Sequence, residues 1–485
     1  MNLSVIFYIV GQVLGIEGIA MALPCVVALI YHERQGLAFL PVIAVCLILG
    51  LIARIRKPAR MEVFARESLI SVALAWIAIS LLGALPFVIC GDIPHYLNAV
   101  FETVSGFTTT GSSILTDVEA LSHCMLFWRS FTHWIGGMGI LVLMLAVIPM
   151  GGGKTMNLMR AESPGPSVGK LVPKMKTTAR LLYQIYMALT IAEILILIIT
   201  RMPVFDAVCI SFGCAGTGGF GVLNSSLASY TPLQQVIAAA FMVLFGVNFT
   251  AYFYIISKKL KLAFGMEEVR VYLGVIAASV VLISINTYRV LGSALPTVRH
   301  AFIQVASIIT TSGFSTVDFN AWPMFSKGLL VILMFIGACA GSTGGGLKVS
   351  RVIVLAKSVR NELRHAVQPR EVRQVYLDRK AMDPNTTISI YRYFITFMLV
   401  FVVSVVLVSL ENHDMSTTLT SVAATLNNIG PGLEMVGPSA NYEFLSPLSK
   451  IVLIADMLVG RLELMPVLIL GLPLAWKKAA RSSRR

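Results

Sequence analysis

The sequence predicts an all-α, polytopic membrane protein with four repeated modules, each made of a helix, a short re-entrant helix, a glycine loop and a second helix. Two extra transmembrane helices precede the modules. The composition indicates a membrane protein, because 56% of the 485 residues are hydrophobic, only 13% are charged and the mean hydropathy is +0.81. Related loops recur around Gly111, Gly219, Gly313 and Gly430 at intervals of roughly 100 residues, which is long enough for two membrane helices per unit.

The chain opens with two apolar segments, residues 3–31 and 37–54, joined by a short polar turn. The first segment lacks the basic start of a secretory signal and stays apolar to about Tyr31. We therefore expect a retained spanning helix, and we assign residues 1–66 to an N-terminal two-helix domain without a glycine loop.

The modules are predicted at residues 67–160, 161–262, 263–362 and 363–485. Their first spans are expected at 69–90, 181–200, 271–290 and 391–410, and their second spans at 129–150, 233–257, 325–356 and 448–476, which makes ten spans with the leading pair. Between them lie runs at 93–107, 204–214, 295–310 and 415–427, too short to cross about 30 Å of hydrocarbon. We predict that each run enters from outside and ends at its glycine loop, where the negative end of the helix favours a cation. Four such units around one axis predict a central pore.

Basic residues give the predicted orientation. The formal charge of +14 comes mainly from clusters within 54–66, 154–180, 258–270, 348–392 and 477–485, which we place in the cytoplasm together with both termini. This distribution fits a lipid bilayer and argues against a nucleic-acid partner. The connection 357–387 is strongly basic; a solvated loop near lipid headgroups is favoured over a docking surface for a soluble regulator.

Several patterns have a structural explanation. The seven cysteines lie mostly in apolar runs and indicate neither a disulfide framework nor a metal cluster. Residues 216–221 match G-x-G-x-x-G but follow no strand, and residues 151–155 lack the first glycine of a phosphate-binding loop. His133 has no nearby carboxylate or Cys/His cluster in the sequence, so we expect a packed histidine.

The glycine loops have the chemistry of a potassium filter built from backbone carbonyls. Glycine relaxes the backbone, and Thr or Ser supplies a supporting hydroxyl. One such loop would be a commonplace turn, whereas four in the same topological position predict an ion filter. The fourth loop has no Thr, so the ring should be asymmetric. The predicted filter residues are Thr109, Thr110, Gly111, Ser112, Thr217, Gly218, Gly219, Phe220, Thr311, Ser312, Gly313, Phe314, Asn428, Ile429, Gly430 and Pro431.

The second span of module three contains ten small residues, 337–346, and should break there. The break lies about halfway across the membrane and so beneath the filter, where we favour a gate over a packing kink. Arg461 is the one Lys or Arg expected inside a span. A charge at such depth usually faces a cavity or pairs internally, and an ion pair with Glu463 or Asp456 is the alternative to a cavity-facing position. The predicted gate comprises Gly337, Gly341, Ser342, Thr343, Gly344, Gly345, Gly346 and Arg461.

The loops, the two leading helices, the segment 341–348 and the Gly-Arg-Leu-Glu segment at 460–463 resemble the TrkH family of potassium-uptake subunits, within the Trk/Ktr/HKT superfamily. The resemblance covers nearly the whole chain. It implies K⁺ bound by carbonyls at Gly111, Gly219, Gly313 and Gly430, a movable gating loop at 337–346 and a pore-facing Arg461. It also implies a homodimer with one pore per chain, a bacterial inner membrane and the cytoplasmic nucleotide-binding regulator TrkA.

We therefore expect channel-like uptake of K⁺, with Rb⁺ also permeant, no enzymatic activity, no covalently bound cofactor, and nucleotide acting only through the regulator. The alternative is a secondary transporter that couples K⁺ to H⁺ or Na⁺. Such a carrier should bury acidic residues in its spans, for which Glu193 and Asp456 are the main candidates. A membrane enzyme would need a catalytic cluster at one depth, and the sequence indicates none.

Overall fold

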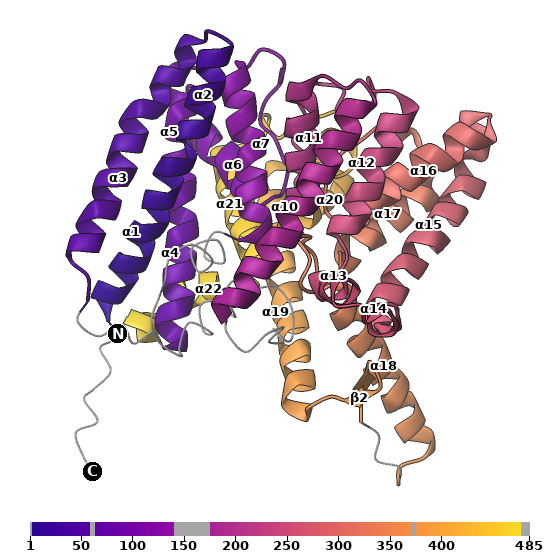
Figure 1. Ribbon diagram of the computed structural model, residues 1–485. Helices are drawn as coiled ribbons and strands as arrows, with labels where there is room; N and C mark the ends of the chain where they lie inside the picture. Colours follow the sequence, from indigo (N-terminus) through magenta and orange to yellow (C-terminus); the bar gives the residue numbers. More distant parts are fainter. Residues whose placement is uncertain (1, 59–63, 140–174, 371–373, 477–485) are drawn as a thin grey trace, which may run out of the picture.

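The computed structural model describes residues 2–58, 64–139, 175–370 and 374–476 (Figure 1). The segment 151–155, the predicted boundary between modules one and two, and the basic cluster 477–485 lie outside the described residues, as do parts of the clusters 54–66, 154–180 and 348–392. Almost all described secondary structure is helical, as predicted.

The N-terminal pair forms one edge of the molecule (Figure 1). Helices α1 (Leu3–Ala20) and α2 (Ala22–Ile30) run together as one span, and η1 (Arg34–Ala38) leads into α3 (Phe39–Ile55). Small residues let α1 and α3 approach closely, since a Cβ on Gly50 would lie 3.0 Å from the Cα of Gly15. The outer face of α3 exposes large apolar side chains, which suits contact with lipid.

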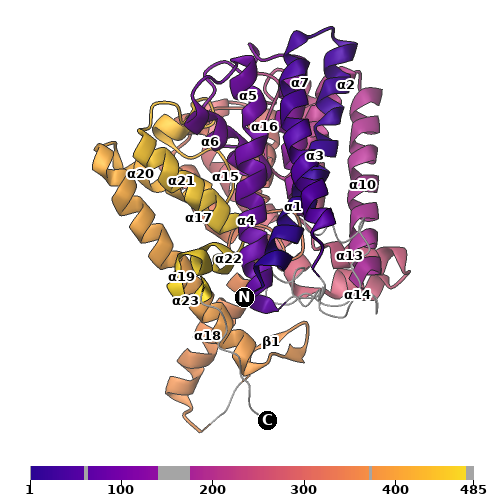
Figure 2. The same ribbon diagram turned by 90° about the vertical axis from the view of Figure 1, so that its left-hand side faces the viewer.

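Each module has the predicted order of elements. The first helices are α4 (Ala65–Gly83) with α5 (Leu85–Cys90), α10 (Met175–Ile199), α15 (Glu267–Leu291) and α19 (Pro384–Val408) with η3 (Ser409–Glu411). The short inserted helices are α6 (Tyr96–Phe107), α11 (Val204–Gly216), α16 (Ala294–Ile309) and α20 (Met415–Leu426). The second helices are α7 (His123–Met138), α12 (Pro232–Phe245), α17 (Met324–Ile336) and α21 (Pro447–Arg461). The inserted helices lie in the upper half of the molecule in Figure 1, and Figure 2 shows α6, α16 and α20 there from the side.

The second helices are shorter than predicted. They contain 13 to 16 residues, so each rises only about 20–24 Å. Among the described residues, six helices are long and apolar enough to span a membrane, or seven if α12 and α13 (Phe249–Ile256) form one bent span. The expectation of continuous spans at 233–257 and 448–476 is therefore wrong, whereas the break in module three is confirmed.

The unexpected breaks have local causes. Helix α13 leaves α12 at 90°; a Cβ on Gly246 would lie 2.3 Å from the Tyr272 hydroxyl, and the Asn248 side chain accepts a hydrogen bond from Thr250 N to begin the new helix. After α21, Glu463 and Leu464 take left-handed φ angles of 59° and 66°. Helix α7 ends at Met138, and the residues after Gly139 are outside the description.

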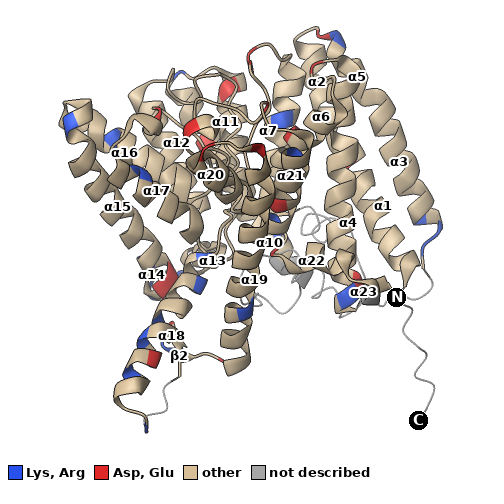
Figure 3. Cartoon of the chain, turned by 180° about the vertical axis from the view of Figure 1, so that it is seen from behind, with Lys and Arg blue, Asp and Glu red and all other residues tan. Residues whose placement is uncertain are grey.

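The lower end of the molecule in Figure 1 carries most of the described basic residues. Figure 3 shows Lys and Arg along α18 (Val349–Val367) and at the adjacent end of α19. A two-stranded antiparallel hairpin, β1 (Tyr376–Leu377) and β2 (Lys380–Ala381), joins these helices. This charge asymmetry agrees with the predicted cytoplasmic side. The remaining short elements are α14 (Leu260–Gly265), η2 (Phe319–Ala321), η4 (Glu434–Val436), α22 (Met465–Leu468), η5 (Ile469–Gly471) and α23 (Pro473–Trp476).

Candidate functional site: a ring of four glycine loops

The four glycine loops, residues 109–112, 217–220, 311–314 and 428–431, share one backbone conformation. Each inserted helix ends at a left-handed residue, which is Thr109, Thr217, Thr311 or Asn428, with φ between 54° and 61°. The N–H of the following residue bonds to the carbonyl five positions earlier at 2.8 Å in every loop, a recognised way of ending a helix. The glycine then has φ of 82°, 80°, 79° or 99°. The fourth loop therefore repeats the geometry without a Thr, because Asn tolerates the left-handed region well.

The loops form a closed ring in chain order. A Cβ added to any of the four glycines would meet the carbonyl oxygen of the residue that precedes the glycine of the next loop. Those distances are 1.9 Å from Gly111 to Gly218, 1.9 Å from Gly219 to Ser312, 2.3 Å from Gly313 to Ile429 and 2.8 Å from Gly430 to Thr110. Backbones this close leave no space for a side chain, which explains glycine at each position.

The carbonyl oxygens of the ring are largely unpaired. Among the described residues, no hydrogen-bond donor reaches the carbonyls of the four glycine loops, with the single exception of Gly430. Most of the loop residues are buried. A buried carbonyl without a partner is costly. The ring therefore suits water, which donates hydrogen bonds to carbonyl oxygens, or a cation, which these oxygens coordinate.

The side chains of the loops hold the ring together. The hydroxyls of Thr108 and Thr110 are 2.8 Å apart, as are those of Thr310 and Ser312. Asn428 Nδ2 donates to Thr110 Oγ1 at 2.9 Å and to the carbonyl of Met457 at 2.9 Å. The Thr and Asn side chains therefore support the backbone. Phe220 and Phe314 are fully buried.

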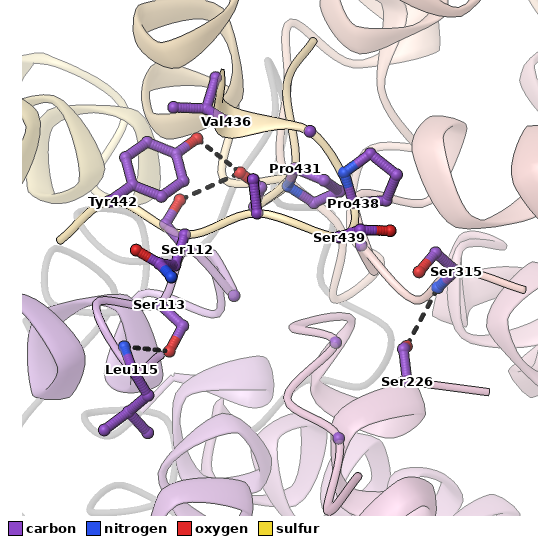
Figure 4. Close-up of a pocket in the computed structure, with 18 of the residues that line it drawn as sticks. Ser112, Ser113, Leu115, Ser226, Ser315, Pro431, Val436, Pro438, Ser439 and Tyr442 are labelled. Carbon is purple, nitrogen blue, oxygen red and sulfur yellow. Dashed lines mark hydrogen bonds between the residues drawn. The ribbon is translucent and has the colours of Figure 1, made fainter. Parts of the chain in front are cut away.

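The outer mouth of the ring is a pocket of about 160 Å³ (Figure 4). Gly111, Gly219, Gly313 and Gly430 all line it, so the structure brings the four predicted glycines together at one site. Hydrogen bonds between modules form a clasp above the ring. In each of them a backbone N–H donates: Val118 N to Asn224 Oδ1, Leu227 N to the Ser315 carbonyl, Glu434 N to Asn320 Oδ1 and Tyr442 N to the Ser113 carbonyl. In this clasp, the hydrogen bond from Asn224 lowers the pKa of Asp117.

An ion pair behind the ring was not predicted. Arg129 lies buried in α7, so the expectation that Arg461 is the sole basic residue within a span is wrong. Arg129 Nε donates to Glu102 Oε1 at 2.5 Å, and Glu102 also accepts from Ile114 N at 3.0 Å. The Arg129 guanidinium stacks 3.6 Å from the Phe220 ring centroid and donates to the Gly221 carbonyl. The pair thus ties loop one to loop two.

His133 packs beneath the second loop, which confirms a packed histidine and assigns its hydrogen bonds. Nδ1 lies 2.7 Å from the carbonyl of Gly106, which can only accept, and Nε2 lies 3.2 Å from Phe220 N, which can only donate. The bonding pattern therefore requires a neutral ring with the proton on Nδ1. A Cβ on Gly218 would lie 2.4 Å from this ring, so glycine there makes space for His133.

The segment between α17 and α18, residues 337–348, which we call the small-residue loop, lies directly beneath the ring. Gly345 N donates to Thr311 Oγ1 at 2.6 Å, and a Cβ on Gly345 would lie 2.3 Å from the Asn427 carbonyl. The loop also bonds to the bend in module two, through Cys339 N to the Gly246 carbonyl at 3.1 Å. The predicted gate residues 337–346 are thus in contact with the predicted filter.

Arg461 bridges three modules below the ring. It donates to the carbonyls of Thr343 at 2.8 Å, Gly136 at 2.5 Å and Gly137 at 2.6 Å. Glu463 pairs with Arg351, and Asp456 accepts from Ser404 Oγ at 2.7 Å, so the two carboxylates named as alternatives have other partners. Arg461 therefore joins α21 to the small-residue loop and to the end of α7.

Glu268 anchors the small-residue loop at both ends. Its carboxylate accepts from Ala340 N at 2.6 Å and from Ser350 N at 3.1 Å, and Asn248 Nδ2 lies 3.2 Å away. The side chain is 5% exposed. Sequence analysis missed it because Glu268 stands at the start of a span, beside Glu267, where an ordinary surface charge is expected.

Other chemistry is sparse in the described chain. No group of three or more His, Cys, Asp or Glu side chains there could hold a metal ion. The seven cysteines are free thiols. The fold and the ring together define a multi-pass α-helical membrane protein built around one axial ring of backbone carbonyls, which is the architecture of an ion-transport protein.

Comparison with known proteins identifies the family. The profile of TrkH, described as a cation transport protein, matches residues 35–475. The chain is 38% identical to the Trk system potassium uptake protein TrkH of Salmonella typhimurium and 37% identical to that of Escherichia coli K12, over 99% of this chain and 100% of each relative. The crystal structure of the potassium transporter TrkH from Vibrio parahaemolyticus superposes with a TM-score of 0.88 at 31% identity, covering 98% of this chain and 100% of that one. The chain belongs to the TrkH family.

Proposed function

We propose that this protein takes up K⁺ across the cell membrane, by channel-like passage through the ring of glycine loops. The observation that carries the proposal is the ring of backbone carbonyl oxygens, which, Gly430 apart, accept no hydrogen bond from the described residues. Such oxygens can replace the hydration shell of a cation, and irregular backbone within a membrane is tolerated only where it is buried in protein or lines a water-filled cavity. The relatives named potassium uptake proteins support K⁺ as the ion.

The small-residue loop and Arg461 form the gate in this proposal. The loop fills the space beneath the ring, and Arg461 places a positive charge between the loop and the end of α7. A fixed positive charge on the axis raises the barrier for a cation that leaves the ring. The loop is not helical and is rich in glycine, so its backbone can change conformation. Glu268 meanwhile holds both ends of the loop in place.

The membrane potential alone supplies the driving force, about 2.3 kcal/mol per charge per 100 mV. The runner-up is a carrier that couples K⁺ to H⁺ or Na⁺. Asp456 bonds to Ser404 between α21 and α19, and Glu193 lies in α10, outside the ring. Since neither carboxylate lines the pocket above the ring, we favour the channel-like route.

We propose a bacterial inner membrane as the location, with both termini in the cytoplasm. The family resemblance supports a homodimer with one pore per chain, and regulation by the nucleotide-binding subunit TrkA. Nucleotide would then act only through that partner, and no covalent cofactor is required. The basic lower end, with α18 and the hairpin, is the surface available to a cytoplasmic regulator.

Ion flux into sealed proteoliposomes tests the proposal. With the internal side negative and no proton or sodium gradient, the protein should take up Rb⁺ and K⁺ well above empty vesicles, and Na⁺ much more slowly. An absolute need for a second ion would favour the carrier. Equal uptake of Na⁺ and K⁺ would contradict a K⁺ filter.

A further inference from the structure

The fourth glycine loop differs from the other three at its glycine carbonyl. Tyr442 Oη donates to the carbonyl oxygen of Gly430 at 2.7 Å, and Ser112 Oγ donates to the same oxygen at 3.2 Å (Figure 4). A carbonyl oxygen has two lone pairs, so two donors use both of them. In the described chain, no donor reaches the equivalent oxygens of Gly111, Gly219 and Gly313.

The position of Gly430 agrees with this difference. Gly430 is buried, whereas Gly111, Gly219 and Gly313 are each partly exposed. Its φ of 99° exceeds the values near 80° of the other three glycines. The fourth loop also approaches its neighbour less closely, with a Cβ distance of 2.8 Å against 1.9 to 2.3 Å elsewhere. The backbone at Gly430 therefore departs somewhat from that at the other three glycines.

Tyr442 is held firmly enough to impose this orientation. Its backbone N–H donates to the Ser113 carbonyl at 2.8 Å, and its ring centroid lies 5.7 Å from that of Phe101 in α6. The residue is 2% exposed. Because both contacts come from module one, the hydroxyl is fixed relative to the first loop as well as the fourth.

We propose that Tyr442 is a positioning residue that withholds the Gly430 carbonyl from the ion. The outermost layer of glycine carbonyls then offers three ligands, from Gly111, Gly219 and Gly313, and leaves the fourth position to water. This inference rests on the proposed function of the ring as an ion filter. It explains why the fourth loop keeps its glycine and its backbone while it departs in sequence.

Replacing the tyrosine by phenylalanine tests the proposal, because Tyr442→Phe removes only the hydroxyl. With Ser112 as the one remaining donor, one lone pair of the Gly430 carbonyl is free to serve as a fourth ligand, which strengthens cation binding at the outer layer. We expect the Rb⁺ concentration for half-maximal uptake to fall about fivefold to tenfold, as for the net effect of one buried hydrogen bond. The measurement is initial Rb⁺ uptake into proteoliposomes at a clamped potential over a range of external Rb⁺.

Tyr230→Phe is the matched control, since Tyr230 Oη donates to Asp206 at 3.0 Å and not to a carbonyl of the ring. It should keep the half-saturating concentration of the parent. A purely structural Tyr442 would lower the maximal rate alone, so an unchanged or higher half-saturating concentration in Tyr442→Phe overturns the proposal. Failure of the parent to take up Rb⁺ would instead reject the proposed function.

Ser112→Ala provides a second route to the same oxygen. It removes the longer hydrogen bond, so we expect a smaller fall in the half-saturating concentration. In the double variant, the two changes act on one acceptor and should not add. If Tyr442→Phe fails to fold, Ser112→Ala alone still tests the proposal. A half-saturating concentration equal to that of the parent would then overturn it.

Discussion

The ring is built from four similar loops, whereas the layer directly beneath it is built from four different structures. In the ring, each of the four loops has a residue in the left-handed conformation, the same 2.8 Å hydrogen bond and a glycine. Beneath it, the second helices give four different structures: the end of α7, the 90° bend between α12 and α13, the small-residue loop, and the end of α21 at Arg461.

This difference fits a division of tasks. Oxygen ligands around an ion must come from several sides at similar depth, which a repeat provides. A gate needs one element that moves against a fixed frame, and a single inserted loop provides that without disturbing the filter. The comparison predicts that changes in the ring affect selectivity, whereas changes beneath it affect the rate of flux.

The largest effect is expected for a side chain in the ring. Gly111→Ser places a Cβ 1.9 Å from the Gly218 carbonyl at a φ of 82°, and Gly313→Ser places one 2.3 Å from that of Ile429. Either change should shift the carbonyls and reduce discrimination of K⁺ over Na⁺ by about tenfold or more, since steric clash adds to about 1–2 kcal/mol of backbone strain. Competitive Rb⁺ and Na⁺ uptake measures it.

Gly328→Ser is the control for these variants. Gly328 lies in α17, and a Cβ there would meet nothing within 4 Å. It should discriminate as the parent does. If Gly111→Ser and Gly313→Ser also reject Na⁺ as the parent does, those glycines do not line the filter.

A change beneath the ring should alter rate without altering selectivity. Arg461→Ala removes the charge and its hydrogen bonds to Thr343 and Gly136, so K⁺ flux should rise by about tenfold, the effect of roughly 1.4 kcal/mol on a barrier. Arg461→Lys keeps the charge and should stay close to the parent. Flux per folded protein in proteoliposomes gives the answer, and unchanged or lower flux in Arg461→Ala would reject its role in the gate.

The ring could be predicted from the sequence because the residues that form each loop are adjacent in the chain. Glycine after Thr or Asn marks a left-handed turn, and the inserted helices follow from length and apolarity; for example, residues 415–427 were predicted and α20 spans Met415–Leu426. Even the break at Gly337 follows from a run of small residues.

The supporting contacts could not be predicted, because they join residues that are distant in sequence. Glu268 reaches Ser350, Tyr442 reaches Gly430 from outside its loop, and Arg129 was taken for a residue at the edge of a span. The bend after α12 lies in a largely apolar run, and Gly246 and Asn248 are the local signals there. Its cause is the contact between Gly246 and Tyr272, which only the fold creates.

The smallest effect is expected outside both layers, at the N-terminal pair. Glu33 accepts from His123 N at 2.7 Å and Cys124 N at 2.9 Å at the start of α7, where the helix dipole favours a negative charge. Partial burial raises the pKa of Glu33, but these hydrogen bonds outweigh it and lower the pKa below its ordinary value of 4.5. The stabilisation is therefore complete above about pH 4.5 and is lost as the pH falls through the lowered pKa.

Glu33→Gln should lower the melting temperature by about 1 °C at neutral pH, because a charge-assisted cap is worth about 1 kcal/mol and the unfolding entropy grows with chain length. It should also remove part of the loss of stability of the parent below about pH 4.5. Thermal unfolding in detergent across pH measures both. Since Glu33 touches neither layer, selectivity and flux should equal those of the parent, and a change in either would show that the N-terminal pair acts on the pore.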